Sequence, residues 1–279
     1  MKVVVAHETL SGPFRDVYPD LEIWKTQKEA DLVIFTGGED ISPEIYKAKP
    51  DGAYGTNPER DKREILLLKK IIDGTFSAGK VLGVCRGHQL ISAYLGMTLI
   101  QDIYSLGISH ASRHGIYWER ETIFSEYERV NSMHHQVVSS RSHALFKDNL
   151  FPCVLAREPQ EGLCESILWG ENILGVQFHP EFMEWSEKER FFDLINQWIS
   201  GKPFYTKKVK GELREKKKIN YSNMEDIIIR EAFGRDIRER PTPVIHDLSN
   251  ISIGTTNTNL TITGLEETIT FHNTDEEIF

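Results

Sequence analysis

A cysteine stands between two glycines in the run GVCRG at residues 83–87. An apolar stretch, 80–84, precedes it and a helical pattern, 87–96, follows, so Cys85 is predicted to lie on a sharp strand-to-helix turn. Such a turn needs small flanking residues, because its backbone is strained and the neighbouring chain passes close. The turn exposes the thiol, and the helix N-terminus favours the thiolate. We therefore predict that Cys85 is a nucleophile, whereas Cys153 and Cys164 are packing residues, as most single cysteines are.

A thiol nucleophile needs a base and a group that orients the base. The run QFHPE at 177–181 offers both where another apolar stretch, 172–178, ends. Residues two apart in an extended chain point to the same side, so Glu181 is predicted to fix the tautomer of His179. A histidine at a strand end is usually only solvated. The prediction therefore rests on the combination of this pair with the cysteine turn.

A glycine-containing loop, TGGED at 36–40, follows the apolar stretch 31–35. Its backbone N–H groups, together with the N–H of Arg86, could stabilise an oxyanion beside the nucleophile. The same residues would also suit an ordinary turn with no role in catalysis. We interpret the loop as one half of an oxyanion hole.

Short β-branched runs alternate with helical patterns along the first 200 residues, which is typical of a parallel α/β sheet. Helices are predicted within 58–78 and 87–96, and after a capping-box pattern formed by Ser186 and Glu189. Short strands and loops are expected between 98 and 155.

The bulk composition is that of a soluble globular protein: 279 residues, 39% hydrophobic, with a formal charge of −9. Excess negative charge argues against a nucleic-acid partner. The chain shows no apolar run of the roughly 18–20 residues that a membrane span needs, and no signal peptide, so no membrane partner is predicted. Three cysteines without CxxC spacing indicate neither a disulfide framework nor a zinc knuckle, which makes a reducing, cytoplasmic setting the default.

The composition changes after about residue 203. Residues 207–218 carry seven cations against two glutamates, and residues 243–279 carry six carboxylates with no Lys or Arg. We predict a catalytic domain over 1–203 and a C-terminal extension over 204–279, partly helical or disordered, whose role the sequence does not reveal. A helix within 223–239 and a hairpin pairing 260–262 with 268–271 are its only predicted elements.

Four motifs with their spacing resemble the class I glutamine amidotransferase superfamily: GVCRGHQL, QFHPE, TGGEDISPEIY and VNSMHHQ. Within it they are most similar to the γ-glutamyl-γ-aminobutyrate hydrolase group, as are ERDKREILLLKKI and GMTLIQD. The resemblance covers residues 1 to about 200. It implies a flavodoxin-like α/β fold, with a mostly parallel sheet flanked by helices, and a non-homologous tail.

The resemblance also implies roles for individual residues. Cys85 would be the nucleophile, His179 the general base and acid, and Glu181 its orienting partner, with Gly38 and Arg86 giving oxyanion N–H groups. Substrate contacts would come from Gly37, Gln89, His134, His135 and Gln136, although a structural role for the two histidines is an equally open reading. Arg86 stands where ammonia-donating members usually have leucine. Only about 30 residues separate the first strand from TGG, fewer than is typical of the group, so the leaving-group pocket is expected to differ.

The predicted activity is cysteine-dependent hydrolysis of a γ-glutamyl amide through a γ-glutamyl thioester, releasing glutamate, with no metal or organic cofactor. The alternative is a glutaminase component that delivers ammonia to a separate synthetase chain. A third reading, a retired amidotransferase domain used for binding, is disfavoured by the complete triad. The sequence does not identify the amine leaving group.

Overall fold

The protein is described by a computed structural model that covers residues 1–108, 110, 112–139 and 150–206, and the backbones of three strands within 252–272. The chain divides into two compact units, Met1–Ala232 and Phe233–Phe279. None of the helices in the described part is long and apolar enough to cross a membrane.

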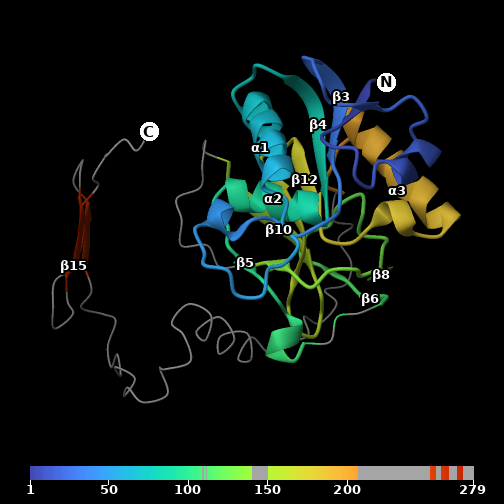
Figure 1. The fold of residues 1–279 in the computed structure, drawn as a ribbon. Coiled ribbons are helices and arrows are strands. Elements are labelled where there is room, and N and C mark those ends of the chain that lie inside the picture. Colours follow the sequence, from blue (N-terminus) through green and yellow to red (C-terminus); the bar gives the residue numbers. More distant parts are fainter. Residues whose placement is uncertain are drawn as a thin grey trace. The chain divides into compact units, whose positions relative to one another are not determined.

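The first unit is built on an eight-stranded sheet in the order β2-β1-β3-β4-β12-β11-β10-β7 (Figure 1). The first five of these strands run parallel: β2 (Glu22–Ile23), β1 (Val3–Val5), β3 (Glu29–Phe35), β4 (Ser77–Val84) and β12 (Ile173–Val176). The other three pair antiparallel: β11 (Cys164–Trp169), β10 (Pro152–Arg157) and β7 (Tyr117–Trp118). The mostly parallel α/β sheet expected from the sequence is confirmed.

Helices pack on both faces of this sheet. The α-helices are α1 (Pro58–Ile72), α2 (Arg86–Tyr94) and α3 (Trp185–Ile199). Short 3-10 helices are η1 (Gly12–Asp16), η2 (Pro43–Tyr46), η3 (Tyr104–Leu106) and η5 (Pro180–Phe182). Two small sheets join β5 (Leu99–Ile100) to β9 (Val137–Val138) and β6 (His114–Gly115) to β8 (Arg129–Val130).

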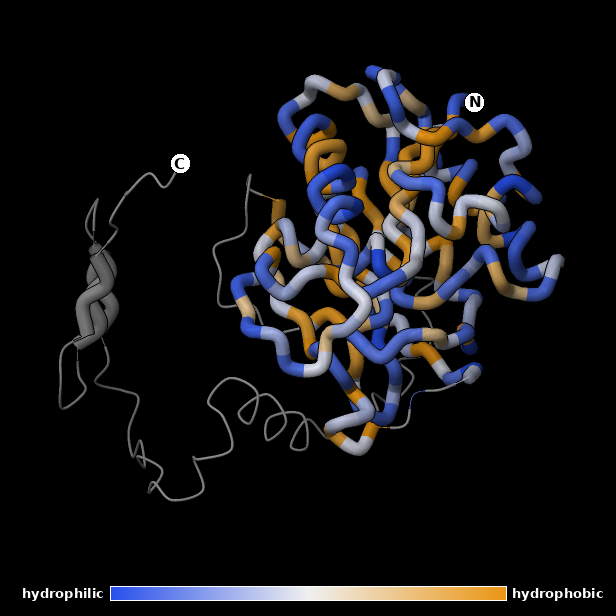
Figure 2. The backbone as a smooth tube through the Cα atoms, viewed as in Figure 1, coloured by the Kyte–Doolittle hydropathy of each residue, from blue (hydrophilic) through white to orange (hydrophobic). Residues whose placement is uncertain are grey.

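Strand alternation divides the core into two layers. Val3 and Val5 of β1 face the cluster that contains Phe191 and Phe192 of α3, whereas Val4 faces the cluster with α1 and α2. Successive side chains of a strand point to opposite faces, so one short apolar strand serves both layers. Figure 2 shows hydrophobic residues along the central strands and mostly hydrophilic ones in the outer loops. The result is a three-layer α/β/α unit.

Helix α3 does not begin with the predicted capping box. Its N-cap is Glu184, which makes no side-chain cap bond, and Trp185 is its first residue. The backbone N–H of Lys188 donates to the carbonyl of Glu184 at 2.9 Å, so Ser186 already lies inside the first turn. The chain enters the helix almost directly from η5, which leaves no extended residue at Ser186 to act as a cap.

The described part of the first unit continues past the predicted boundary at residue 203. The N–H of Ile123 donates to the carbonyl of Phe204 at 3.0 Å, and the N–H of Thr206 donates to the carbonyl of Glu121 at 3.1 Å. Phe204 is buried against Phe124 and Trp198. Residues 204–206 therefore belong with the packed unit, while the division into a catalytic domain and an extension stays a prediction.

The second unit contains three antiparallel strands, β13 (Ser252–Thr255), β14 (Asn259–Thr263) and β15 (Ile269–His272). Leu260 lies opposite Phe271, as in the predicted hairpin. The strand β13, which was not predicted, pairs with β14 as well. The helix predicted within 223–239 lies outside the described residues.

Replacing Gly87 by Ala should destabilise the first unit, because α2 crosses β3 at this residue. A Cβ there would lie 2.1 Å from the carbonyl oxygen of Phe35, a backbone atom that cannot rotate away. We expect a loss of about 1–3 kcal/mol in the free energy of unfolding, the range for an overpacked core, measured by denaturant titration. Gly12→Ala is the matched control, since a Cβ there meets nothing within 4 Å. Equal stability of the two variants would contradict the close approach.

Candidate active site

Cys85 lies on a strained turn between β4 and α2. It is the N-cap of α2 and has φ 49° and ψ −103°, a conformation that non-glycine residues rarely adopt. Its N–H donates to the carbonyl of Val176 at 2.8 Å, and its carbonyl accepts the N–H of Gln89 at 3.0 Å. A Cβ on Gly83 would lie 2.9 Å from the backbone of Gly87, so both glycines allow the close passage that the sequence predicted.

His179 and Glu181 meet directly, although not as two residues of an extended strand. His179 is the N-cap of η5, and Glu181 is in that 3-10 turn, so the geometric reason given by the sequence was wrong. The imidazole Nδ1 lies 2.7 Å from Oε1 of the fully buried Glu181. Because a carboxylate only accepts, Nδ1 carries the proton and Nε2 is left for the thiol. Cys85 lies close enough to His179 to interact electrostatically with the imidazole.

Asn131 holds the backbone of the histidine from the other side. Its Oδ1 accepts the N–H of His179 at 2.8 Å, and its Nδ2 donates to the carbonyl of His179 at 2.8 Å. This residue was not singled out from the sequence. The one sequence feature that could have pointed to Asn131 is its place at the start of the NSMHHQ run, three residues before His134.

The electrostatics favour a charged imidazole. Burial opposes protonation of His179, but the interactions with Cys85, followed by those with Glu181, outweigh it and raise the pKa of His179 to about 10. At neutral pH the imidazolium is therefore the stable form beside the cysteine. A neighbouring positive charge is what a thiolate nucleophile requires.

The TGGED loop lies against this imidazole. A Cβ on Gly37 would be 2.6 Å from Cε1 of His179, so only glycine fits between them. Gly38 has φ 144°, which is also strained for any other residue. Arg86 follows Cys85 directly. The TGGED loop thus lies beside the imidazole, and Arg86, the other predicted source of an oxyanion N–H group, is next to the nucleophile in the chain.

A buried ionic network holds both the TGGED loop and the cysteine turn in place. Arg60 on α1 is fully buried, and its guanidinium donates to the carbonyls of Thr36 at 3.2 Å and Gly37 at 3.0 Å. Its Nε donates to Oε1 of Glu64 at 2.9 Å, and the other oxygen of Glu64 accepts from Arg86. The Arg86 side chain therefore does not face a substrate; it ties the nucleophile turn to α1.

Asp61 completes the network. One of its oxygens accepts from Arg86, and the other accepts the hydroxyl of Ser42 at 2.6 Å. Burial raises the pKa of Asp61, partly offset by the Ser42 hydrogen bonds and Arg86. In the sequence, the run ERDKRE stood out only through its resemblance to the hydrolase group. The sequence feature that could have revealed the network is the set of opposite charges on one helix, Arg60, Asp61 and Glu64, which are spaced i, i+1 and i+4 beside apolar residues.

The predicted substrate residues separate into two groups. Gln89 donates to the carbonyl of Gln136 at 2.9 Å, and Nδ1 of His134 lies 2.9 Å from the same carbonyl. Burial lowers the pKa of His134 well below its ordinary value, so it is neutral. The side-chain amide of Gln136 has no partner among the described residues, which leaves it available to a ligand.

His135 lies apart from that buried group. Its Nε2 is 2.9 Å from a carboxylate oxygen of Asp40, its Nδ1 is 3.6 Å from Asp102, and its ring stacks on Tyr54 with centroids 4.5 Å apart. Tyr54 is exposed. His134 and His135 are thus adjacent in sequence but occupy different environments, one neutral and enclosed, the other among carboxylates.

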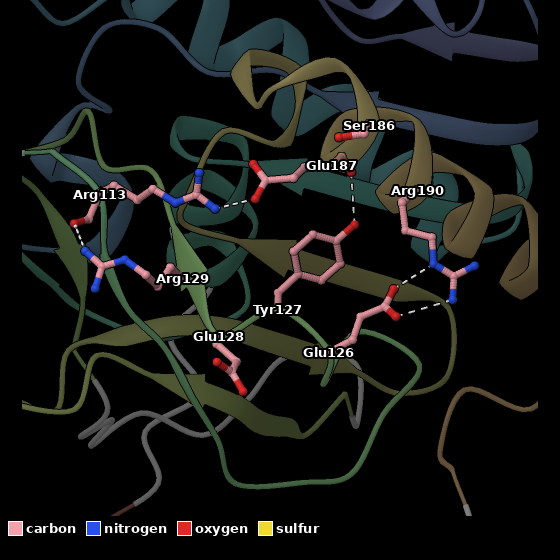
Figure 3. Close-up of a pocket in the computed structure, with 8 residues that line it drawn as sticks. All are labelled: Arg113, Glu126, Tyr127, Glu128, Arg129, Ser186, Glu187 and Arg190. Atoms are coloured by element: carbon pink, nitrogen blue, oxygen red, sulfur yellow. Dashed lines mark hydrogen bonds and ion pairs between the residues drawn. The ribbon is translucent and has the colours of Figure 1, made fainter.

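A separate pocket of about 470 Å³ lies between α3 and the β6–β8 region (Figure 3). Four of its six charged residues form ion pairs with one another: Arg190 with Glu126 at 2.7 Å, and Arg113 with Glu187. None of the predicted catalytic residues lines it. We therefore do not assign the chemistry to this pocket.

Glu64→Gln should impair both stability and activity, because it leaves two buried guanidinium groups without their shared carboxylate. Removing one partner of a buried ion pair costs about 3–5 kcal/mol. Glu59→Gln is the matched control on the same helix, since the side chain of Glu59 is 86% exposed and that of Glu64 is 0% exposed. Denaturant unfolding and glutamate release are the measurements. Equal behaviour of the two variants would show that the network does not hold the site.

Residues 19–181 match the Peptidase C26 family. The chain is 34% identical over 166 residues to a putative glutamine amidotransferase-like protein YvdE of Lactococcus lactis subsp. lactis, covering 54% of this chain and 66% of that protein. A YvdE homologue of Lactococcus lactis subsp. cremoris is 36% identical over 129 residues, which cover 41% of this chain and 67% of that protein. The chain thus spans about two thirds of the length of these relatives.

Among solved structures, the fold is similar to that of a putative GMP synthase subunit from Thermoplasma acidophilum. The TM-score is 0.50, with 15% sequence identity, over 72% of this chain and 95% of that chain. This likeness concerns the fold alone. The family match spans more than half of the chain and includes the cysteine turn and the QFHPE run. The chain therefore belongs to the Peptidase C26 family, within the class I glutamine amidotransferase-like superfamily.

Proposed function

We propose that this chain hydrolyses a γ-glutamyl amide, either glutamine or a γ-glutamyl-amine, through a thioester on Cys85. The observation that carries the proposal is the buried His179, which contacts Glu181 on one side and the strained Cys85 on the other. Membership of the family supports amide hydrolysis or amide-nitrogen transfer in general. The choice of the γ-glutamyl group rests on the motif resemblance.

The first half-reaction forms the thioester. The thiolate of Cys85 attacks the γ-carbonyl carbon, a C–S bond forms, and the carbonyl electron pair moves to oxygen. The N–H groups of Gly38 and Arg86 stabilise that oxyanion. As the intermediate collapses, the C–N bond breaks and the imidazolium of His179 gives its proton to the departing amine.

The second half-reaction releases glutamate. Once the thioester has formed, the cysteine no longer carries a negative charge, so neutral His179 can accept a proton from water. The hydroxide adds to the thioester, the C–S bond breaks, and the cysteine leaves as thiolate. Glutamate departs and His179 is again the imidazolium. No metal or organic cofactor takes part in these steps.

The alternative is a glutaminase component whose ammonia passes to a separate synthetase chain. The Thermoplasma protein with a similar fold is described as a putative GMP synthase subunit, which keeps this candidate open. Arg86 favours the hydrolase, because ammonia-donating members of the superfamily usually have leucine at this position. Its guanidinium is enclosed by Asp61 and Glu64, so the cysteine turn is held without another chain. We further propose 1–203 as the catalytic region, with no role assigned to the extension.

A panel of γ-glutamyl amides and glutamine tests the two candidates on the purified full-length chain. We expect glutamate release at a typical enzyme kcat, about 1–10³ s⁻¹ on the best substrate. An alkyl-amine leaving group should be preferred over ammonia, because apolar contacts to the amine add binding that glutamine cannot make. Cys85→Ala should abolish the activity, and a glutamine-like electrophile should label Cys85.

The labelling and the kinetics separate the possible failures. A chain that is silent on every amide while Cys85 is still labelled would favour the partner-activated glutaminase. Labelling of Cys153 or Cys164 instead, with Cys85→Ala still active, would refute the assignment of the nucleophile.

The pH profile should report the raised pKa of His179. Formation of the thioester needs the imidazolium, so kcat/KM should stay level through neutral pH and fall as the pH rises through about 10. Glu181→Gln removes a group that raises this pKa, so the falling limb should move to lower pH. Its rate cost should be on the order of 10–10³, smaller than the ~10⁴ seen for the carboxylate of a serine triad.

His179→Ala is the companion variant. It removes the acid itself, so its loss of activity should exceed that of Glu181→Gln. An equal or reversed order of losses, or a falling limb unmoved by Glu181→Gln, would show that the roles are assigned wrongly.

A further inference from the structure

A second cluster of polar side chains lies outside the proposed triad. It combines His110, from the loop before β6, with His114 on β6 and Glu165 on β11. One oxygen of Glu165, Oε1, lies 3.2 Å from Nε2 of His110 and 3.5 Å from Nε2 of His114. The side chain of Glu165 is fully buried and that of His110 nearly so. The proposed reaction uses none of the three.

The tautomer of His114 follows from its hydrogen bond. Its Nδ1 lies 2.8 Å from the carbonyl oxygen of Gly115, which can only accept, so Nδ1 carries the proton. The other nitrogen, Nε2, then presents a lone pair toward the carboxylate of Glu165. Two electron-rich atoms facing each other in a buried site repel unless a cation or a proton lies between them.

Polar atoms in the cluster also lack partners. Within the described residues, Oε2 of Glu165 and Nε2 of His114 make no hydrogen bond. Buried carboxylates are normally paired or bound to a metal. A ring N–H that donates to a backbone carbonyl, with the opposite nitrogen left free, is the usual arrangement of a metal-bound histidine.

The spacing fits a small transition-metal ion. Ligand atoms about 2.0–2.1 Å from a tetrahedral Zn²⁺ lie roughly 3.3 Å from one another. Two separations here, 3.2 and 3.5 Å, are close to that value. All three ligand atoms lie within 4.8 Å of one another, so the two imidazoles need to approach each other by at most about 1.5 Å to complete the set. Two histidines and a carboxylate are a common zinc set that leaves a fourth position for water or another ligand.

We propose that His110, His114 and Glu165 bind one divalent transition-metal ion, with Zn²⁺ as the best fit. The ion joins the loop before β6 to β11. The N–H of Gln177 donates to the carbonyl of Glu165 at 2.8 Å, and the ring of His134 packs 4.8 Å from that of His110. The metal therefore supports the wall beside the predicted substrate residues and takes no part in the proposed hydrolysis.

This site departs from the sequence expectation of no metal. That expectation rested on the spacing of the cysteines and on the predicted mechanism, whereas the relevant sequence feature is a histidine pair four residues apart, HASRH at 110–114. Its third member, Glu165, is more than 50 residues away and is brought in by the antiparallel half of the sheet.

The test is a Zn²⁺ titration of the full-length chain carrying Cys85→Ala, which removes the thiolate most able to bind zinc by itself. Calorimetry should show one site, and Zn²⁺ should raise the unfolding temperature, since a ligand that binds only the folded state stabilises it. Adding His114→Gln or Glu165→Gln should weaken binding at least tenfold. Adding Glu119→Gln, a carboxylate that pairs with Arg157 and is not a member of the cluster, should leave the affinity unchanged.

Co²⁺ provides a second readout that does not depend on activity. The complex should show visible d–d bands without a thiolate charge-transfer band. The proposal is overturned if the chain binds no Zn²⁺ at one equivalent, which would indicate a proton shared between Glu165 and a histidine. It is also overturned if a charge-transfer band places the metal on a cysteine, or if His114→Gln binds as tightly as its parent. His114 is only partly buried, so this variant remains informative if Glu165→Gln does not fold.

Discussion

The carboxylate of Glu64 lies between two guanidinium groups, and the geometry of the proposed active site depends on it. Through Arg60 it fixes the carbonyls of the TGGED loop, and through Arg86 it fixes the residue after the nucleophile. Charges removed from water are tolerated only when nearly all of their hydrogen-bonding groups are paired. A shift of either loop would leave a buried charge unpaired. The network therefore resists a change in the separation of the two loops, although its side chains contribute no atom to the reaction.

Packing of α2 against the sheet supports the same two loops. The strain at Cys85 persists because its N–H and carbonyl are both engaged and because Gly87 lets α2 approach the backbone of β3. The two core layers press the helices onto the sheet from both faces. Rigid elements thus hold a nucleophile whose own conformation is unfavourable. A loop alone could not do this, because it would relax to an ordinary turn.

Local features were predictable from the sequence, and features that need distant partners were not. The cysteine turn could be predicted because an apolar stretch, two glycines and a helical pattern are contiguous. His179 and Glu181 were placed together for the wrong reason, since a 3-10 turn and not an extended chain brings them into contact. Arg60 and Arg86 are 26 positions apart, and nothing in either segment shows that Glu64 serves both. The start of α3 was missed because the preceding turn, and not a serine cap, sets it.

The histidines near the proposed site show how the same burial leads to opposite charge states. Burial lowers the pKa of His134 and also that of His88, the latter to about 3. Neither histidine has an anionic partner strong enough to offset the effect of burial. His179 is nearly as buried, but Cys85 and Glu181 raise its pKa by more than burial lowers it. His88 and His134 can therefore only give or accept hydrogen bonds at neutral pH, whereas His179 holds a proton that it can transfer. Charge, more than position, supports His179 as the general acid of the proposed reaction and His134 as part of the wall around it.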